Sequence, residues 1–270
     1  MSTATATTAT DQGFGAVLRW WRGERRMSQL DLASEAMTTP RYVSFVETGR
    51  AQPSRQMVVR LARALDVPLR ERNGLLLAAG FAPLYTRGQL DAPQLARVDT
   101  ALRSMLAQHE PFPAVVMDRG WTVLRANGGA ERLFGTVLGG APLPDPANVL
   151  RLFIEPGPVR SAVRNWSEVA PALLDRARRE AVGGVFDRET AGLVQELRER
   201  PDVAALLART TAPPPVPVID VRFAVPGLEL GFFSVVSTIG TPVDVTAQEL
   251  RVEAFFPSDD ATRTAWSASR

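Results

Sequence analysis

The chain has 270 residues, of which 45% are hydrophobic and 22% are charged, a composition typical of a globular protein long enough for two domains. It has no cysteine and one histidine, His109, which excludes disulfides, thiolate metal sites, cysteine nucleophiles and two-histidine metal sites. Any Ser-His-Asp triad would have to use His109, and no partner stands at a readable spacing from it. We therefore expect no cofactor, no metal and no enzymatic activity, and we expect His109 to be a surface or hinge residue.

The charges divide unevenly along the chain. All 31 basic residues are arginines; residues 1–90 carry 12 of them against 7 acidic residues, whereas residues 91–270 carry 19 against 22. The basic front part predicts a polyanionic partner. No apolar stretch approaches the roughly 18 residues that a membrane span needs, and residues 1–10 lack the basic and apolar regions of a signal peptide. These features predict a cytoplasmic protein without a membrane partner.

Between residues 14 and 80 the apolar residues recur at helical spacing and predict five short helices without a strand. Ser28 is the expected N-cap of the second helix. Thr38 or Thr39 is the expected N-cap of the third, with Pro40 in its first turn, where a missing N–H is harmless.

The second half mixes strand and helix patterns. Residues 91–108 are expected to form a helix that connects two domains, and residues from 258 onward to form a polar, frayed tail. The predicted strands are rich in Val, Phe and Ile and cover residues 114–117, 121–124, 218–225, 228–239 and 250–256. The predicted helices cover residues 127–134, 149–153, 163–182 and 189–200, with loops over 135–146 and 210–217. Two strands, several helices and then three strands predict one antiparallel sheet with helices packed on one face.

The first half carries a specific motif. Ser28-Gln29-Leu30-Asp31-Leu32-Ala33 is followed by Thr39-Pro40-Arg41-Tyr42-Val43-Ser44-Phe45-Val46-Glu47-Thr48-Gly49-Arg50 and then by Pro53-Ser54. This series resembles the helix-turn-helix of the XRE or lambda-repressor-like family over residues 13–84. The resemblance implies an all-α domain that binds double-stranded DNA through its third helix. The candidate DNA contacts are Gln29, Thr39, Pro40, Arg41, Ser44, Phe45 and Arg50.

Several roles in this motif stay open. Arg41 either bonds bidentately to guanine in the major groove or remains solvated, and Phe45 either contacts a thymine methyl group or fills the core. By the resemblance Glu47 anchors the fold, and Met37 departs from the family at a turn position that usually carries glycine. Four further arginines either form a solvated face or include phosphate contacts, namely Arg19, Arg22, Arg25 and Arg26.

The second half also resembles a known family. The matching segments are Asn148-Val149-Leu150-Arg151-Leu152-Phe153, Asn165-Trp166, residues 232–242 and Glu253-Ala254-Phe255-Phe256-Pro257. They look like the ligand-binding domain of MmyB-like transcription regulators, and with the helix-turn-helix the resemblance covers residues 13–257. The second domain of that family is PAS-like, which implies a small apolar ligand such as a fatty acid.

Ten apolar residues are candidates to line a ligand pocket between the sheet and its helices. The alternative for each is that it is an ordinary core residue. They are Val115, Met117, Trp121, Val123, Phe134, Phe153, Trp166, Phe233, Val235 and Phe255. Alternation along residues 230–239 puts Phe233 and Val235 on one face of the strand and Phe232 on the other, and which face points inward stays open. Asn127 is expected to be an N-cap rather than a ligand contact.

The expected fold is α+β, with an all-α helix-turn-helix domain joined to a PAS-like antiparallel-sheet domain with helices. The expected parts are a flexible tail (residues 1–12), the DNA-binding domain (13–84), a connecting helix (85–110), the ligand-binding domain (111–257) and a second tail (258–270). The leading hypothesis is a sequence-specific transcriptional regulator that senses a small apolar ligand. It would bind a palindromic operator as a homodimer, because one module reads too few base pairs. One alternative is a DNA-binding regulator whose second domain serves only dimerisation or protein interaction; another is an enzyme fused to a DNA-binding module.

Overall fold

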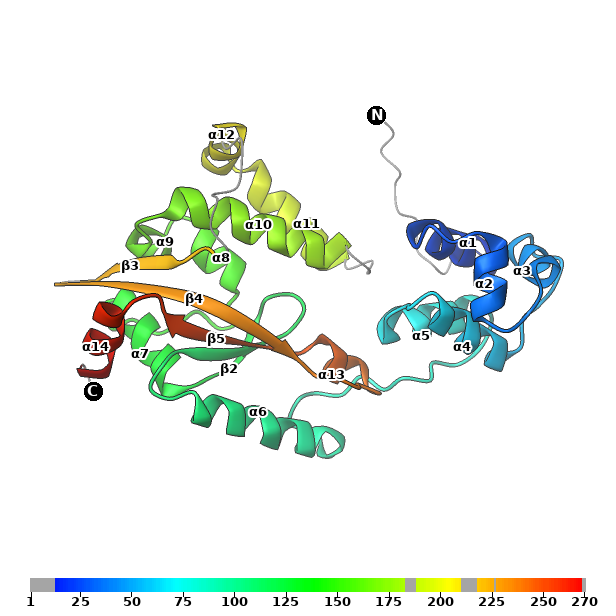
Figure 1. The fold of residues 1–270 in the computed structure, drawn as a ribbon, viewed down its shortest axis with the longest axis horizontal. Helices are drawn as coiled ribbons and strands as arrows, with labels where there is room; N and C mark the ends of the chain where they lie inside the picture. Colours follow the sequence, from blue (N-terminus) through cyan, green and yellow to red (C-terminus); the bar gives the residue numbers. More distant parts are fainter. Residues whose placement is uncertain (1–12, 183–187, 210–217, 226, 269–270) are drawn as a thin grey trace. The chain divides into compact units, whose positions relative to one another are not determined.

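The computed structural model describes residues 13–182, 188–209, 218–225 and 227–268 (Figure 1). The tail expected over residues 1–12 and the Pro-rich connector expected over 210–217 lie outside the described residues. The chain divides into two compact units. We call Met1–Arg87 with Val243–Val245 the N-terminal unit, and Gly88–Pro242 with Thr246–Arg270 the C-terminal unit. The first contains helices, and the second combines helices with a sheet, which confirms the predicted α+β fold class.

The described residues of the N-terminal unit form five helices, as predicted. They are α1 (Phe14–Glu24), α2 (Gln29–Glu35), α3 (Pro40–Glu47), α4 (Arg55–Ala64) and α5 (Leu69–Ala78). The Ser28 hydroxyl accepts a hydrogen bond from Asp31 N at 3.1 Å, and the Thr39 hydroxyl accepts one from Tyr42 N at 3.2 Å. Ser28 is thus the N-cap of α2, and Thr39 rather than Thr38 is the N-cap of α3.

One apolar core holds these helices together. Its buried members include Leu18, Trp21, Leu32, Val43, Val46, Leu61 and Leu76. Gly15 lies where α1 meets α3: a Cβ at this position would stand 2.5 Å from Val46 O and 2.6 Å from Glu47 O. Only glycine permits the backbones of the two helices to approach this closely.

The C-terminal unit contains a five-stranded antiparallel sheet in the order β2-β1-β5-β4-β3. The strands are β1 (Ala114–Met117), β2 (Val123–Ala126), β3 (Val221–Val225), β4 (Leu228–Thr238) and β5 (Arg251–Pro257). The described helices are η1 (Pro93–Leu95), α6 (Ala96–Gln108), α7 (Gly128–Val137), α8 (Val149–Ile154), α9 (Pro158–Ala162), α10 (Trp166–Val182), α11 (Arg188–Glu199), α12 (Pro201–Arg209), α13 (Val245–Glu249) and α14 (Asp260–Ala268). Because β5 pairs with both β1 and β4, the last strand of the chain joins the two predicted groups of strands.

Helices cover both faces of this sheet, so the prediction of one covered face is wrong. Alternate residues of β1 point to opposite sides: Val115 enters the large core that we call the main core, and Val116 enters a smaller one. Leu102 and Leu106 of α6 pack into the smaller core. Figure 1 shows α6 on one side of the sheet and α10 on the other. The apolar stripe of residues 91–108, which we interpreted as a connector between domains, buries part of the second face.

The predicted polar tail is also wrong over residues 260–268, which form α14. Trp266 is the reason, because it is buried and anchors the helix. Its ring lies edge-on to Phe232 with ring centres 5.6 Å apart, and its Nε1 donates to Pro111 O at 2.8 Å. One aromatic residue therefore orders a segment whose polar composition is typical of a frayed end.

His109, which we expected to be a surface or hinge residue, is in contact with the sheet. It is half-buried at the end of α6, and its Nε2 lies 2.8 Å from Phe255 O. Its ring also packs edge-on against Phe256, with ring centres 4.9 Å apart. His109 thus fastens α6 to the central strand. No helix in the described ranges is long and apolar enough to cross a membrane.

Candidate nucleic-acid interface and ligand site

The turn between α2 and α3 has the geometry that the motif requires. Met37 lies in this turn with φ +48° and is 77% exposed. It adopts the left-handed conformation that glycine supplies at low cost, so its departure from the motif leaves the turn intact. Arg60 Nη2 donates to the carbonyl oxygens of Ala36 and Met37 at 2.5 and 2.7 Å, and α4 thereby holds the turn in place.

Helix α3 buries one face and presents the other to solvent. Val43 and Val46 are buried in the core, at a spacing of three residues. The candidate DNA contacts on and after this helix are exposed or half-buried, namely Thr39, Pro40, Arg41, Ser44, Phe45 and Arg50. The Arg41 guanidinium lies 5.2 Å from the centre of the Phe45 ring, one turn along the helix. Phe45 therefore contacts Arg41 on the solvent side, which disfavours the alternative that it fills the core.

Glu47 connects the helix-turn-helix to α1. It is 5% exposed and accepts hydrogen bonds from Arg22 Nε at 2.7 Å, Arg22 Nη2 at 3.0 Å and Gln29 Nε2 at 2.9 Å. Burial acts to raise the pKa of Glu47, but the hydrogen bonds from Arg22 and Gln29 and the charges of Arg22 and Arg19 outweigh it and hold that pKa below its ordinary value. Glu47 thus joins α1, α2 and α3, in agreement with the anchoring role that the resemblance implies.

These contacts also define what Gln29 and the first arginines do. Gln29 gives one amide hydrogen to Glu47, and its amide group has a second one. Arg22 is paired with Glu47, and Arg25 donates to Leu65 O and Asp66 O, both at 2.9 Å. Arg22 and Arg25 therefore stabilise the fold instead of forming a solvated face.

In the C-terminal unit, eight of the ten ligand candidates gather in or against the main core. They are Val115, Met117, Trp121, Val123, Phe134, Phe153, Trp166 and Phe255. Phe233 and Val235 do not join them, because the inward face of β4 is that of Phe232. Val235 is 48% exposed, and the Phe233 ring stacks on Phe256 with ring centres 5.6 Å apart. Asn127 accepts a hydrogen bond from Ala130 N at 2.9 Å and is the N-cap of α7, as predicted.

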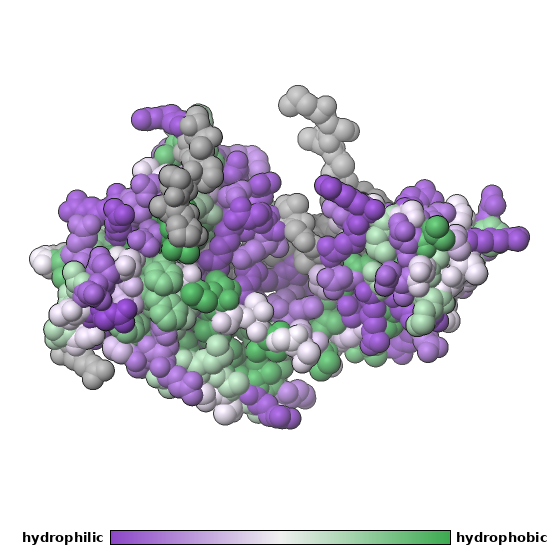
Figure 2. Space-filling view, viewed as in Figure 1, coloured by the Kyte–Doolittle hydropathy of each residue, from purple (hydrophilic) through white to green (hydrophobic). Residues whose placement is uncertain are grey.

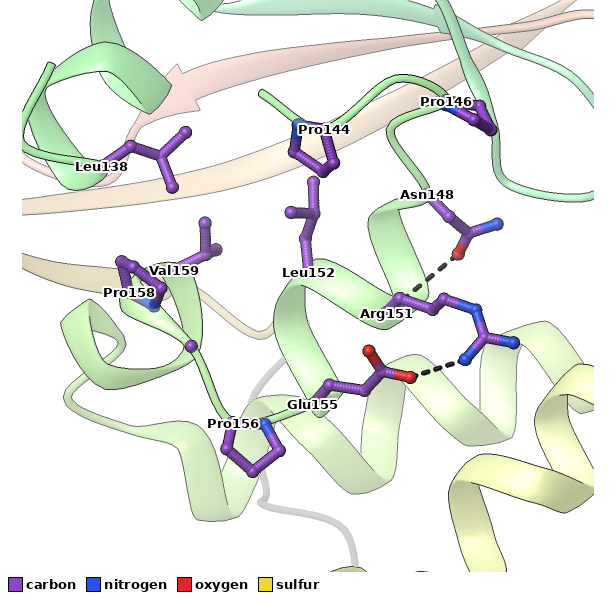
Figure 3. Close-up of a pocket in the computed structure, with 11 residues that line it drawn as sticks. Leu138, Pro144, Pro146, Asn148, Arg151, Leu152, Glu155, Pro156, Pro158 and Val159 are labelled. Carbon is purple, nitrogen blue, oxygen red and sulfur yellow. Dashed lines mark hydrogen bonds and ion pairs between the residues drawn. The ribbon is translucent and has the colours of Figure 1, made fainter. Parts of the chain in front are cut away.

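A surface pocket of about 250 Å³ opens beside α8 (Figure 3). Leu138, Leu152 and Val159 form its apolar wall, and they also belong to the main core or pack against it. On its polar side Asn148 Oδ1 accepts a hydrogen bond from Arg151 N at 3.2 Å, and Arg151 Nη1 pairs with Glu155 at 2.5 Å. None of the ten ligand candidates lines this pocket.

A network of charges crosses from α10 to the sheet, and sequence reasoning missed it. Arg176 Nη1 donates to Glu253 Oε1 at 3.0 Å, and Arg176 Nε donates to Glu180 Oε1 at 3.1 Å. Glu253 also accepts from the Ser234 hydroxyl at 2.5 Å, and Glu180 pairs with Arg251. Burial acts to lower the pKa of Arg176, but the two carboxylates outweigh it and raise that pKa above its ordinary value. The signal that could have found the network is Glu253, an acidic residue inside a largely apolar strand.

In the part of the chain that the structure describes, no group of three His, Asp or Glu side chains is placed to hold a metal ion. The arrangement offers instead a helix that presents Arg41 and Phe45 to solvent in one unit, and a large apolar core with a side pocket in the other. An exposed helix face and a surface pocket are features of binding sites.

Comparison with known families identifies both halves of the chain. Residues 98–268 match the family model of the MmyB-like transcription regulator ligand binding domain, and residues 18–72 match a helix-turn-helix model. Both matches agree with the resemblances noted in the sequence.

Among curated proteins, the chain is similar to multiprotein-bridging factor 1 of Debaryomyces hansenii, with 36% identity over 63 residues, and of Saccharomyces cerevisiae, with 38% identity over 63 residues. Each alignment covers 23% of this chain and 42% of the relative, so the chain spans less than half the length of these relatives. Among solved structures, an RNA-binding light-oxygen-voltage receptor aligns with 98% of this chain and 62% of its own, at 14% identity and a TM-score of 0.28.

The ligand-binding match covers more than half of the chain, and a helix-turn-helix precedes it. Both matched domains are regulatory ones, for binding DNA and for binding a ligand. The chain therefore belongs to the MmyB-like transcription regulators and is a DNA-binding transcription regulator with a ligand-binding domain.

Proposed function

We propose that the protein binds a palindromic operator as a homodimer, and that a small apolar ligand such as a fatty acid, held in the C-terminal unit, changes its affinity for DNA. The DNA-binding part of this proposal rests on the solvent-exposed face of α3. There Arg41 stacks on Phe45 near the start of the helix, while Val43 and Val46 bury the opposite face. A recognition helix needs this combination of a buried face and free side chains at its N-terminal end.

The proposed contacts follow from the chemistry of each side chain. Arg41 reads guanine by two parallel hydrogen bonds, and Phe45 contacts a thymine methyl group. Thr39, Pro40 and Ser44 lie against the groove edge and the sugar-phosphate backbone. The second amide hydrogen of Gln29 and the exposed guanidinium of Arg50 bind phosphate oxygens.

The dimer follows from the small size of one module. A single helix-turn-helix reads too few base pairs to find its site among the competing sites of a genome. Two copies related by a two-fold axis read half-sites roughly 34 Å apart, which makes the operator palindromic.

The ligand part rests on the main core and on the pocket beside it. The core gathers eight apolar candidates on one face of the sheet, and Leu138, Leu152 and Val159 line the pocket at its edge. The pocket volume of about 250 Å³ lies near the lower end of the range of roughly 300–1,000 Å³ for small-molecule sites. A fatty acid is the ligand that the family resemblance implies.

A second candidate for the C-terminal unit is dimerisation alone. It is favoured by apolar side chains on the sheet face opposite the main core, where Phe256 is 37% and Val235 48% exposed. Figure 2 shows hydrophobic surface over β4 and β5. Native mass spectrometry of the purified protein, with extraction of any bound lipid, separates the two functions. An apolar ligand that copurifies with the protein, or that binds when added, supports ligand sensing. If no such ligand is found, dimerisation is the function supported for the C-terminal unit.

The DNA part is tested on the full chain with an operator selected from random duplexes. We expect Arg41→Ala to relax the preference for one base and to cost about 1–3 kcal/mol at that position. Arg50→Ala should weaken all sequences alike and reduce the slope of log affinity against log salt by about 1. Arg63→Ala, at an exposed arginine of α4, serves as the control and should change neither quantity. An unchanged preferred sequence and affinity in Arg41→Ala would show that α3 is not the recognition helix.

Two further measurements test the other parts of the proposal. Light scattering that finds only monomers, both free and on DNA, contradicts the homodimer. A saturating apolar ligand should change DNA affinity by roughly 5- to 150-fold, the usual range of coupling between two sites. No change with any apolar compound contradicts sensing.

A further inference from the structure

Part of β4 has no strand beside it. β4 pairs with β5 as far as Thr238, whereas β3 reaches only to Val221, which lies opposite Phe232. Figure 1 shows β4 continuing well beyond β3. Residues 233–238 of β4 therefore form a sheet edge that no described strand covers, and we call this segment the open edge.

The direction of the backbone groups in the open edge follows from Gly231. Its N–H donates to Thr262 Oγ1 at 3.0 Å and its carbonyl oxygen accepts from Ser258 N at 2.9 Å, so both groups point toward the β5 side of the strand. Backbone groups alternate in direction along a strand, and β4 pairs with β5 without a register shift. Three residues of the open edge therefore direct their N–H and C=O groups away from β5, namely Ser234, Val236 and Thr238.

The chain contacts both outer edges of the sheet with its own residues. On the outer side of β3, Arg222 N donates to Asn165 Oδ1 at 3.1 Å and Arg222 O accepts from Arg164 N at 2.8 Å. On the outer side of β2, Val123 N donates to Ala147 O at 2.8 Å. In contrast, no backbone hydrogen bond within the described ranges reaches the outward groups of the open edge, so these groups are free to pair.

The open edge lacks the features by which proteins protect exposed strands. Charged side chains, prolines and β-bulges are the usual devices. Residues 233–238 read Phe-Ser-Val-Val-Ser-Thr and carry no charge and no proline, and no register shift interrupts them. Val235 and Val236 point to opposite faces of the sheet, and they are 48% and 37% exposed. A strand added here would gain backbone hydrogen bonds and cover both valines.

We propose that the open edge pairs antiparallel with the same edge of a second copy of this chain, so that the two sheets join across a two-fold axis at Val236. This inference rests on the homodimer of the proposed function and names the surface that forms it. With Val236 opposite its own copy, Ser234 lies opposite Thr238 of the second copy. Each such pair exchanges two N–H···O=C hydrogen bonds, because the backbone groups of all these residues point outward.

The pattern of the edge favours a second copy of the chain as its partner. A two-fold axis places each residue opposite the one equally far from the centre, so a charge beside the axis would face a like charge. The open edge carries none, and its outward-pointing residues are symmetric about Val236. An axis at Val235 would instead place Thr238 opposite Phe232, whose backbone already pairs with Val221. The axis at Val236 is therefore the one that uses every outward group.

The first test measures dimerisation of the full-length protein by light scattering and sedimentation equilibrium. Val236→Pro removes an outward N–H that pairs with no described residue, so the fold should keep its unfolding midpoint. The change removes the two central hydrogen bonds of the dimer and should weaken dimerisation by roughly 10- to 100-fold. Val236→Lys should also weaken it, since it places two positive charges opposite each other at the axis. Val243→Lys, at a valine that is 82% exposed outside the strand, is the matched control and should leave the dimer unchanged.

The second test locates the axis with single cysteines, which is straightforward because the chain has none of its own. The two copies of Val236→Cys would have Cα atoms about 5.5 Å apart, within the range that a disulfide spans. In Thr238→Cys the two cysteines would lie about 14 Å apart, too far for a disulfide. Oxidation with diamide should therefore link Val236→Cys into a covalent dimer and leave Thr238→Cys unlinked.

The outcomes separate this inference from the homodimer on which it rests. If the wild-type protein is a monomer both free and on DNA, the proposed homodimer itself fails. If it is a dimer that Val236→Pro and Val236→Lys leave intact, the homodimer stands and uses another surface, which refutes the role of the open edge. A disulfide that forms in Thr238→Cys but not in Val236→Cys refutes the axis at Val236.

Discussion

Replacing Glu47 by glutamine tests how the recognition helix is held. The carboxylate accepts three hydrogen bonds, two from Arg22 and one from Gln29, and Arg19 Nε lies 3.6 Å from it. Glutamine fills the same space but is neutral, and it has only one oxygen to accept these bonds. The change therefore leaves the Arg22 guanidinium, 18% exposed, without its counter-charge.

The magnitude follows from those contacts. Hydrogen bonds to a charged group are worth about 1.5–3 kcal/mol each, and breaking a buried ion pair by removing one partner costs about 3–5 kcal/mol. The glutamine oxygen retains part of this interaction, so we expect a loss of about 3 kcal/mol at pH 7. For a domain of this size the unfolding midpoint should fall by roughly 15 °C.

The pH dependence has a definite sign. Because the folded state holds the pKa of Glu47 below its ordinary value of 4.5, the stabilisation is fully present above about pH 4.5 and disappears as the pH falls through the lowered pKa. The difference in unfolding free energy between wild type and Glu47→Gln should be constant from pH 5.5 to 8 and should shrink below pH 4.5.

The assay is urea unfolding of the full chain at a series of pH values, followed by hydrogen exchange of peptides from α1 and α3. Glu35→Gln, at an exposed acid in α2, is the matched control and should stay within about 0.5 kcal/mol of wild type. A loss in Glu47→Gln that is equal at pH 3.5 and pH 7 would refute the reasoning, because it would show that packing rather than charge is what the glutamate contributes.

Three further substitutions, with Gly135→Ala as the control for one of them, test the backbone and the core. Met37→Gly should stabilise the protein by about 0.5–1 kcal/mol in thermal unfolding, because glycine relieves the left-handed φ of +48°. Gly129→Ala should destabilise it by at least about 2 kcal/mol, because the new Cβ would lie 2.5 and 2.6 Å from two backbone oxygens, whereas Gly135→Ala in the same helix meets open space and should be neutral or mildly stabilising. Trp266→Ala should cost about 3–5 kcal/mol in urea unfolding and release the last helix to rapid hydrogen exchange, since it removes the buried anchor of that helix.

The N-terminal unit was largely predictable because its signals are local. Ser28 and Thr39 cap helices that begin at the next residue, and each can be identified from its immediate neighbours. The partners of the arginines could not be predicted in the same way. Arg22 pairs with a glutamate 25 residues further along the chain, and Arg25 donates to a carbonyl oxygen 40 residues further along. Neither contact can be inferred from the formal charge of the segment. Net charge therefore overstates the number of arginines that are free to meet a phosphate.

In the C-terminal unit the positions of the strands along the chain were predictable, but the direction in which β4 faces was not. Both faces of this strand are apolar, with Phe232 on one and Phe233 on the other, so alternation alone does not say which is inward. The answer depends on what covers each face. The helices on the side of Phe232 form the main core with the sheet. On the opposite side, α6 packs against β1 and β5.

Apolar composition cannot separate the wall of a ligand site from an ordinary core, because both are built from the same side chains. Trp121 and Trp166 were equal candidates in the sequence. In the fold they differ: the Trp166 N–H is satisfied by a backbone carbonyl, whereas the Trp121 N–H is buried, unpaired and carried on a left-handed backbone. Each of these features costs free energy that a core residue would not need to spend. The two tryptophans are therefore distinguished only by the hydrogen-bond partner and the backbone conformation that the fold gives to each.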